Sequence, residues 1–239
     1  MKLRNFDPLM GAARRARGLV AIAGLCGALL ALPVTSRADI KLGGNLGPGD
    51  SYDTSFGLLV GNDFGGDNLA EGSSFVSSAT AQVTALKIAL SCFDTGFCPD
   101  DFTVALDADN SNQPGTALES FTVSAASLGA LGNNNPVIVL SSILHPTLSA
   151  GTQYWVTVSS DLNDTIIWNW NSTGDTSAEA ESIDGGSTWF SPSGNTPGAF
   201  EVSTPEVNSV LLLFTVVLFA GVLQLFRRKQ AVAARHTGR

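Results

Sequence analysis

The sequence predicts an all-β fold, a single β-sandwich of jelly-roll type formed by residues 39–203. Three observations predict it. Apolar and polar residues alternate in short runs, clusters of Gly, Asn, Asp, Pro and Ser separate these runs, and no stretch of about ten residues carries a helical apolar stripe. Half-buried antiparallel strands, with one side on a core and the other in water, have this alternation. We expect about nine strands.

The amino-terminal segment 1–38 has the three parts of a secretory signal peptide. A basic stretch ends at Arg17, an uncharged apolar run covers residues 18–32, and small residues precede a cleavage site between Ala38 and Asp39. The apolar run is shorter than the ~20 residues of a membrane span. We therefore expect cleavage by signal peptidase, and an uncleaved anchor is the less favoured alternative.

Four segments of the middle region show the strand alternation most clearly: 84–90, 102–106, 153–159 and 166–171. The residues expected on their core side are Leu86, Ile88, Leu90, Phe102, Val104, Leu106, Tyr154, Val156, Val158, Ile166, Trp168 and Trp170. Turns are expected at 110–115, 132–136 and 184–186, because Asn, Asp, Gly and Pro supply the backbone angles that turns need.

The carboxyl-terminal segment 204–239 predicts a membrane anchor. Gln224 is the only strongly polar member of residues 210–226, and a helix of this length spans ~26 Å, just enough for the hydrocarbon layer. A basic tail, 227–239, follows, and its first residues are Arg227, Arg228 and Lys229. Basic residues favour the cytoplasmic side, so residues 39–209 are expected outside. A buried soluble helix is the less favoured alternative.

Charge is segregated along the chain. Residues 39–206 hold two lysines and twenty acids, a net charge of −18, whereas each end carries +5. An acidic middle region argues against nucleic-acid binding, which needs a basic surface. Weak, dispersed binding of divalent cations to this surface is expected, since opposite charges accumulate there.

The cysteines fit an exported protein. Cys26 is lost with the signal, and Cys92 and Cys98 remain as a pair between two strand patterns. We expect a disulfide that closes a hairpin loop. A metal site at these cysteines is disfavoured, because no histidine lies nearby to complete it.

Two motifs suggest chemistry, and in each the structural reading is favoured. Gly49-Asp50-Ser51 is similar to the nucleophile block of GDSL-type hydrolases, but His145 is the lone histidine of residues 39–209 and lacks an Asp three residues before it. The segment that begins with Asp107 and Asp109 spaces oxygen side chains as a calcium loop does, yet it lacks the later Glu of an EF-hand. A turn explains both, with no resident cofactor expected.

Tryptophans are the remaining binding candidates. Trp168 and Trp170 share a face with Ile166, so core packing is favoured over a sugar-stacking platform. Trp155 alternates onto the side of polar residues, which makes it the better candidate for a glycan or protein contact, and edge packing against a loop is an equally favoured alternative. Trp189 follows a glycine-rich turn and is expected to cover one end of the sandwich.

The tail resembles the PEP-CTERM sorting signals of Gram-negative bacteria. Thr204-Pro205-Glu206, the apolar span and the basic cluster have that layout, with Val207 where the second proline of the family motif stands. The resemblance implies processing by exosortase, a membrane-embedded cysteine protease. A permanent membrane anchor is the competing interpretation.

The middle region resembles the choice-of-anchor R domain, a bacterial surface domain found with different sorting signals. The motifs that carry the resemblance are residues 47–52, 113–116, 118–121, 148–155, 168–171 and 184–189. The resemblance implies an anchored extracellular domain and brings no catalytic residues.

Together these observations predict an exported protein held at the cell surface or in the extracellular matrix of a Gram-negative bacterium. We expect a non-catalytic structural or binding module, associated with exopolysaccharide or biofilm matrix on the strength of the tail resemblance alone. The alternatives are a secreted hydrolase of glycans or esters and a passive spacer. The scarcity of histidine ranks the enzyme last.

Overall fold

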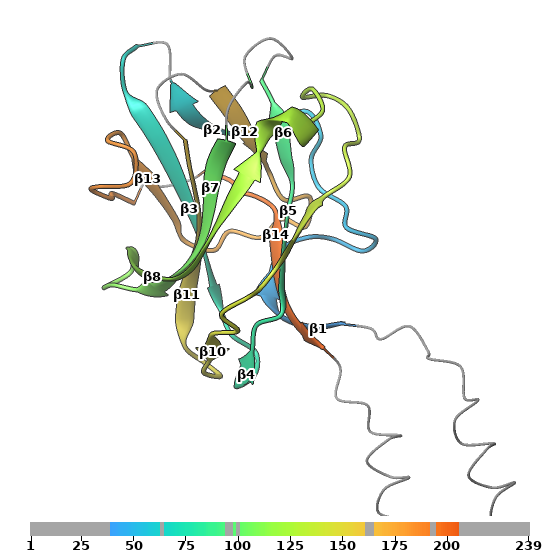
Figure 1. Cartoon of the computed structure of the whole chain (residues 1–239), viewed down its shortest axis with the longest axis vertical. Helices are drawn as coiled ribbons and strands as arrows, with labels where there is room; N and C mark the ends of the chain where they lie inside the picture. The colour runs from blue at the N-terminus through green and yellow to red at the C-terminus, as the bar shows by residue number, and fades with distance from the viewer. Residues whose placement is uncertain are drawn as a thin grey trace, which may run out of the picture. The chain divides into compact units, whose positions relative to one another are not determined.

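Two antiparallel sheets pack face to face in the part of the chain that the computed structural model describes, residues 39–62, 65–93, 98, 101–160, 165–191 and 195–205 (Figure 1). The elements are β1 (Asp39–Gly44), β2 (Gly57–Asn62), β3 (Asn68–Val76), β4 (Ala81–Gln82), β5 (Ala85–Ile88), β6 (Leu90–Cys92), β7 (Asp101–Asp109), β8 (Pro114–Ser124), the 3-10 helix η1 (Ala125–Ser127), β9 (Ile138–Ser141), β10 (Thr147–Leu148), β11 (Gln153–Ser159), β12 (Thr165–Asn169), β13 (Glu179–Ser182) and β14 (Phe200–Pro205).

The smaller sheet has the order β1-β14-β5-β9, and the larger sheet has the order β6-β12-β2-β3-β11-β7-β8, with β13 also paired to β3. A short ladder joins β10 to β4. The strand pairs of these sheets are antiparallel. The expected all-β class with packed sheets is confirmed, and the arrangement is β-sandwich-like. The described strands outnumber the expected nine, because several are only two to four residues long.

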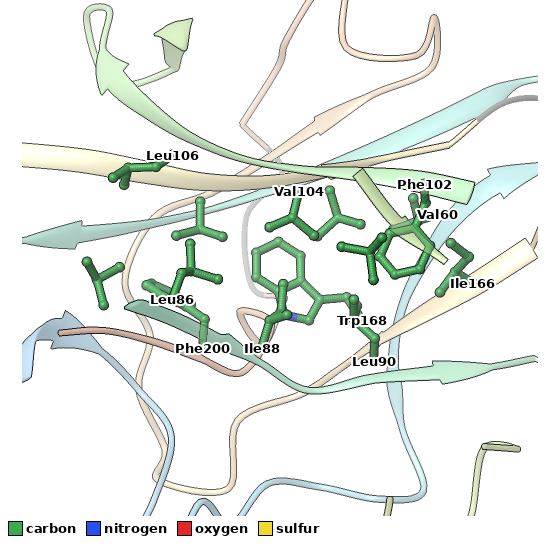
Figure 2. Close-up of a cluster of buried hydrophobic side chains, with 14 of the residues drawn as sticks. Val60, Leu86, Ile88, Leu90, Phe102, Val104, Leu106, Ile166, Trp168 and Phe200 are labelled. Carbon is green, nitrogen blue, oxygen red and sulfur yellow. The ribbon is translucent and has the colours of Figure 1, made fainter. Parts of the chain in front are cut away.

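The core lies between the two sheets and is built from the alternating residues of both (Figure 2). Trp168 on β12 is fully buried at its centre, with its ring 6.2 Å from that of Phe200 on β14. A Cβ on Gly198 would collide with the Trp168 ring, so this position requires glycine. The predicted core residues Leu86, Ile88 and Leu90 are buried as expected.

The predicted strand 84–90 is divided between the two sheets. β5 pairs with β14 in the smaller sheet, whereas β6 pairs with β12 in the larger one. The crossing occurs at Ala89, whose amide donates to Ala199 O and whose carbonyl accepts from the Asn169 amide. The apolar alternation continues through the crossing because both halves face the same core.

The predicted turns are present. The β7–β8 hairpin turns at 110–113, with positive φ angles of 56° at Ser111 and 65° at Asn112. Gly185 and Gly186 also have positive φ, 72° and 92°, in the turn after β13. Glycine and asparagine adopt this left-handed conformation at little cost, which is why these residue types marked the turns.

Cys92 and Cys98 form the expected disulfide, with Cα atoms 5.7 Å apart. The expectation of a hairpin loop is wrong, because β6 pairs with β12 and β7 pairs with β11 and β8. The alternation on each side of the cysteines shows that two strands are present, but it does not give their pairing partners.

The predicted boundaries fall close to the ends of the described residues. Asp39 begins β1, and β14 continues through Thr204 and Pro205, two residues beyond the predicted end at 203. The signal segment with Ala38, the second sorting residue Glu206, the span 210–226 and the basic cluster Arg227-Arg228-Lys229 lie outside the described residues. Within the described ranges, no helix is long and apolar enough to cross a membrane.

Candidate functional site: a polar hollow on the outer face of the larger sheet

The outer face of the larger sheet is covered around Trp155, and the expectation that this side chain faces water is wrong. Trp155 is fully buried. On β3, Gly72 provides the space, since a Cβ there would lie 3.4 Å from the indole and 3.1 Å from Pro114. Pro114 is buried at the start of β8, so the β7–β8 hairpin folds back over this part of the sheet. Alternation placed Trp155 on the outer face correctly but did not show that a hairpin covers that face.

The covering hairpin is held by polar contacts to β11. The indole N–H of Trp155 donates to Oδ1 of Asp109 at 2.8 Å, and Nε2 of Gln153 donates to the same oxygen at 2.9 Å. The backbone amide of Asn112 donates to Oδ2 of Asp109 at 3.3 Å. The bond from Trp155, together with the weaker bonds from Asn112 and Gln153, lowers the pKa of Asp109. Asp109 therefore acts as an ionised anchor for the turn.

Asp107 lies on the same outer face but in a drier place. It is buried beside Trp155 in the β7–β11 register and accepts a 2.7 Å hydrogen bond from Oγ1 of Thr157. Burial raises its pKa to about 6, against the opposing effect of that bond. The two carboxylates proposed as cation ligands are thus neighbours whose oxygens accept bonds from protein donors. Among the described residues, no group of three or more His, Cys, Asp or Glu is arranged to hold a metal ion.

A second loop, residues 183–189, follows β13 and is organised by Asp184. Its carboxylate accepts bonds from the hydroxyl of Ser182 at 2.7 Å, and from the amide and hydroxyl of Thr188 at 2.8 and 2.7 Å. These bonds, led by that from the Thr188 amide, lower the pKa of Asp184 to about 2. The loop is therefore fixed by one ionised carboxylate, and it carries Trp189 at its end.

The two loops meet through Gln113, whose Nε2 donates to the carbonyl of Trp189 at 2.9 Å. Between them lies a hollow of about 710 Å³. Figure 1 shows both loops on the same side of the larger sheet, the turn before β8 in green and the loop after β13 in orange. The lining residues are Ala108, Asp109, Asn110, Gln113, Pro114, Gly115, Thr116, Gly186, Ser187, Thr188 and Trp189.

The lining of this hollow is mainly polar and includes one aromatic side chain. Carboxylate, amide and hydroxyl groups line it beside the indole of Trp189, which is half-buried. None of the lining residues is basic. Sequence analysis placed Trp189 only as a cover for the sandwich end. The nearby motif Asp184-Gly185-Gly186 was the signal available, because it predicted a turn and Trp189 follows that turn by three residues.

The other two candidate tryptophans lie elsewhere. Trp168 is in the central core, as expected. Trp170 is half-buried after β12 and stacks on Phe56, with ring centroids 5.5 Å apart and planes inclined by 20°. Phe56 is 58% exposed, so it covers part of Trp170 and leaves its own outer face in water. The structure does not bring these two tryptophans to the hollow.

The residues of the hydrolase alternative are engaged in turns. The amide of Gly47 donates to the carbonyl of Ser51 at 2.9 Å, and Gly49 and Asp50 have positive φ between them. The favoured explanation of this motif as a turn is confirmed. His145 lies between β9 and β10, with Nδ1 3.1 Å from the carbonyl of Val83.

A buried carboxyl pair lies on the inner side of β3 and β13. Glu71 and Glu179 are each 4% exposed and are hydrogen-bonded to each other. Burial, with the nearby charges of Glu179 and Glu181, raises the pKa of Glu71 to about 10, and burial raises that of Glu179 to about 7. The pair therefore holds a proton at neutral pH. Because both carboxyls are buried, this pair is not open to a glycoside substrate.

Comparisons with protein-family models, with curated proteins and with solved structures gave no match for this chain. The two resemblances described above therefore remain predictions.

Proposed function

We propose that the chain is an exported, membrane-anchored β-sandwich that binds a polysaccharide in the hollow between the β7–β8 turn and the 183–189 loop. One observation carries the proposal: the hollow is lined by the half-buried indole of Trp189 together with amide, hydroxyl and carboxylate groups. Carbohydrate sites need these two elements, since sugars present an apolar ring face and a rim of hydroxyl groups.

The charges of the hollow select the class of glycan. Asp109 is ionised there, and no lysine or arginine lines the hollow. An acidic glycan would place its carboxylates or sulfates near Asp109 without a cation to balance them. We therefore propose a neutral polysaccharide of the extracellular matrix as the ligand.

The surface location rests on the two ends of the chain. Residues 1–38 have a signal pattern, and residues 204–239 resemble a PEP-CTERM signal with an apolar span at 210–226. The disulfide between Cys92 and Cys98 agrees with an oxidising compartment. The jelly-roll type of sandwich and membership of the choice-of-anchor R domains belong to the same proposal, as does processing by exosortase.

Glycan binding is tested on the purified chain in detergent micelles, with neutral and acidic oligosaccharides titrated by calorimetry. We expect saturable binding of a neutral glycan that weakens about tenfold or more in Trp189→Ala, as for truncation of an aromatic hot spot. Phe190→Ala is the matched control, because Phe190 is the 44% exposed neighbour of Trp189 and does not line the hollow. Equal binding by wild type and Trp189→Ala, or no binding to any glycan, contradicts the proposal.

A further inference from the structure

The turn that joins β9 to β10 displays two large apolar side chains in water. Ile143 is 82% exposed and Leu144 is 68% exposed, the two most exposed large apolar residues of the described chain. We call this pair the Ile143–Leu144 tip. Single exposed apolar residues are ordinary, but two adjacent ones at the apex of a tight turn form a compact projection.

The tip is held rigidly from below by Glu119 of β8, which is 5% exposed. Its carboxylate accepts hydrogen bonds from the amides of Ile143 and Leu144, at 2.6 and 3.0 Å, and from the hydroxyl of Ser142 at 2.5 Å. Burial alone would raise the pKa of Glu119, but these three bonds, together with an electrostatic contribution from His145, outweigh it and lower the pKa. The ionised carboxylate thus fixes the backbone of the turn, and this fixed backbone holds the two apolar side chains in their exposed positions.

The tip lies at the end of the domain where β14 ends. The amide of Thr84 donates to the carbonyl of Ser203 on β14, and the amide of Ser142 donates to the carbonyl of Thr84, both at 2.9 Å. Ser142 is therefore two strand spacings from β14, a lateral distance of ~10 Å. In Figure 1 the carboxyl end of β14 lies at the same end of the domain as β10, which follows the turn, and β4, which pairs with β10.

The chain after β14 reaches the apolar span within a few residues. Pro205 ends β14, and residues 206–209 separate it from Val210, the first residue of the predicted span. Five extended residue steps cover at most ~18 Å. If residues 210–226 cross the bilayer, the end of the domain that carries the tip cannot move far from the membrane surface.

We infer that the Ile143–Leu144 tip is a membrane-contact site, which inserts into the interfacial layer of the bilayer beside the carboxyl-terminal anchor. This inference rests on the proposed anchoring. The second point of contact would limit rotation of the domain about the short linker and hold the polysaccharide-binding face in a defined orientation. The only positive side chains that the described residues contain are Lys41 and Lys87, so the occupant is a zwitterionic lipid surface rather than an anionic one.

The experiment uses the exported chain, residues 39–239, in phosphatidylcholine vesicles; Cys26 is absent from it and Cys92 and Cys98 are bridged, so an introduced cysteine can be labelled selectively. Ile143→Cys is labelled with a polarity-sensitive fluorophore, and nitroxide lipids serve as quenchers. Ile183→Cys is the matched control. Ile183 is 48% exposed and lies beside Asn68, the first residue of β3. The nine residues of β3 span ~30 Å, so Ile183 lies far from the end of the domain that carries the tip.

We expect a blue-shifted emission and lipid quenching at position 143, and neither at position 183. Retention of the chain after alkaline carbonate extraction is measured on the same vesicles. Retained protein without quenching at position 143 overturns the membrane contact and leaves the anchoring intact. A blue shift that lipid nitroxides do not quench, and that disappears on dilution of protein in lipid, shows contact with a second copy and also overturns it. Loss of the chain on extraction overturns the anchoring and the contact together.

Discussion

The indole N–H of Trp155 lies 2.8 Å from Oδ1 of Asp109, so a fully buried aromatic residue on β11 holds the exposed carboxylate that ends β7. This bond ties the covering hairpin to the sheet and places Asp109 at the edge of the polar hollow. Two residues that sequence analysis assigned to separate functions, glycan contact and cation binding, therefore form one structural unit.

This unit gives a prediction for Trp155→Phe, which keeps the aromatic ring but removes the donor. In a double-mutant cycle with Asp109→Ala, we expect a coupling energy of about 1 kcal/mol, the size of one hydrogen bond with a partly exposed partner. Urea unfolding of the four proteins measures it. The pKa of Asp109 should rise in Trp155→Phe, because its largest stabilising bond is lost. A coupling energy near zero would show that Trp155 stabilises the fold through packing of its ring and that its hydrogen bond to Asp109 adds nothing.

Alternation was sufficient to predict the core residues, because the apolar face of a strand can be identified from the sequence of that strand alone. Leu86, Ile88 and Trp168 were placed correctly for this reason. The cover over Trp155 could not be predicted, since it depends on how the β7–β8 hairpin folds back onto a strand forty residues later. Long-range register is a property of the whole sheet, and single-strand patterns do not contain it.

The same limit applies to the hollow and to the buried acids. Trp189 and Asp109 line one hollow only because the loop after β13 and the turn before β8 lie on the same side of the larger sheet. Glu71 and Glu179 meet because β13 pairs with β3, which brings Glu179 opposite Ser73 and Glu181 opposite Glu71. Among twenty acids in residues 39–206, the sequence offers no means to select this pair.

The Glu71–Glu179 pair predicts that stability falls as pH rises. The folded pKa of Glu71, about 10, lies above its ordinary value of 4.5, so the folded state keeps a proton that the unfolded chain releases. The contribution of Glu71 to stability is therefore fully present below pH 4.5 and declines up to pH 10 by at most about 1.4 kcal/mol per pH unit for one proton. Glu179 adds to the decline between pH 4.5 and about 7.

Glu71→Gln should flatten this decline, because a neutral amide can donate to Glu179 as the protonated carboxyl does. Urea midpoints from pH 5 to 9 measure the slope. Asp101→Asn, at an exposed position in β7, is the control and should leave the slope of the wild type unchanged. An equal slope in Glu71→Gln and wild type would show that Glu71 is ionised in the folded protein.

Asp184 predicts an acid-sensitive loop. Its folded pKa of about 2 is below the ordinary value of 3.8, so the ionised carboxylate favours the native loop above pH 3.8, and this contribution is lost as the pH falls towards 2. Hydrogen exchange of the Thr188 amide, which donates to Asp184, reports the loss directly. In Asp184→Ala we expect fast exchange of this amide even at neutral pH, together with weaker glycan binding at Trp189. Slow exchange in the variant would show that other contacts hold the loop.

Reduction of the disulfide tests how much the connection from β6 to β7 depends on it. Cys92 and Cys98 are separated by six positions, and the chain-entropy model gives about 2 kcal/mol for a loop of this size. The bridge also joins two positions of the core, 3% and 9% exposed, so the paired variant Cys92→Ala/Cys98→Ala should lose at least that much. Urea unfolding of this variant and of reduced wild type measures the loss. If reduction alone accounts for the whole effect, the stabilisation arises from the restricted unfolded chain. A larger loss in the alanine variant would instead assign the difference to packing of the two sulfur atoms against the core.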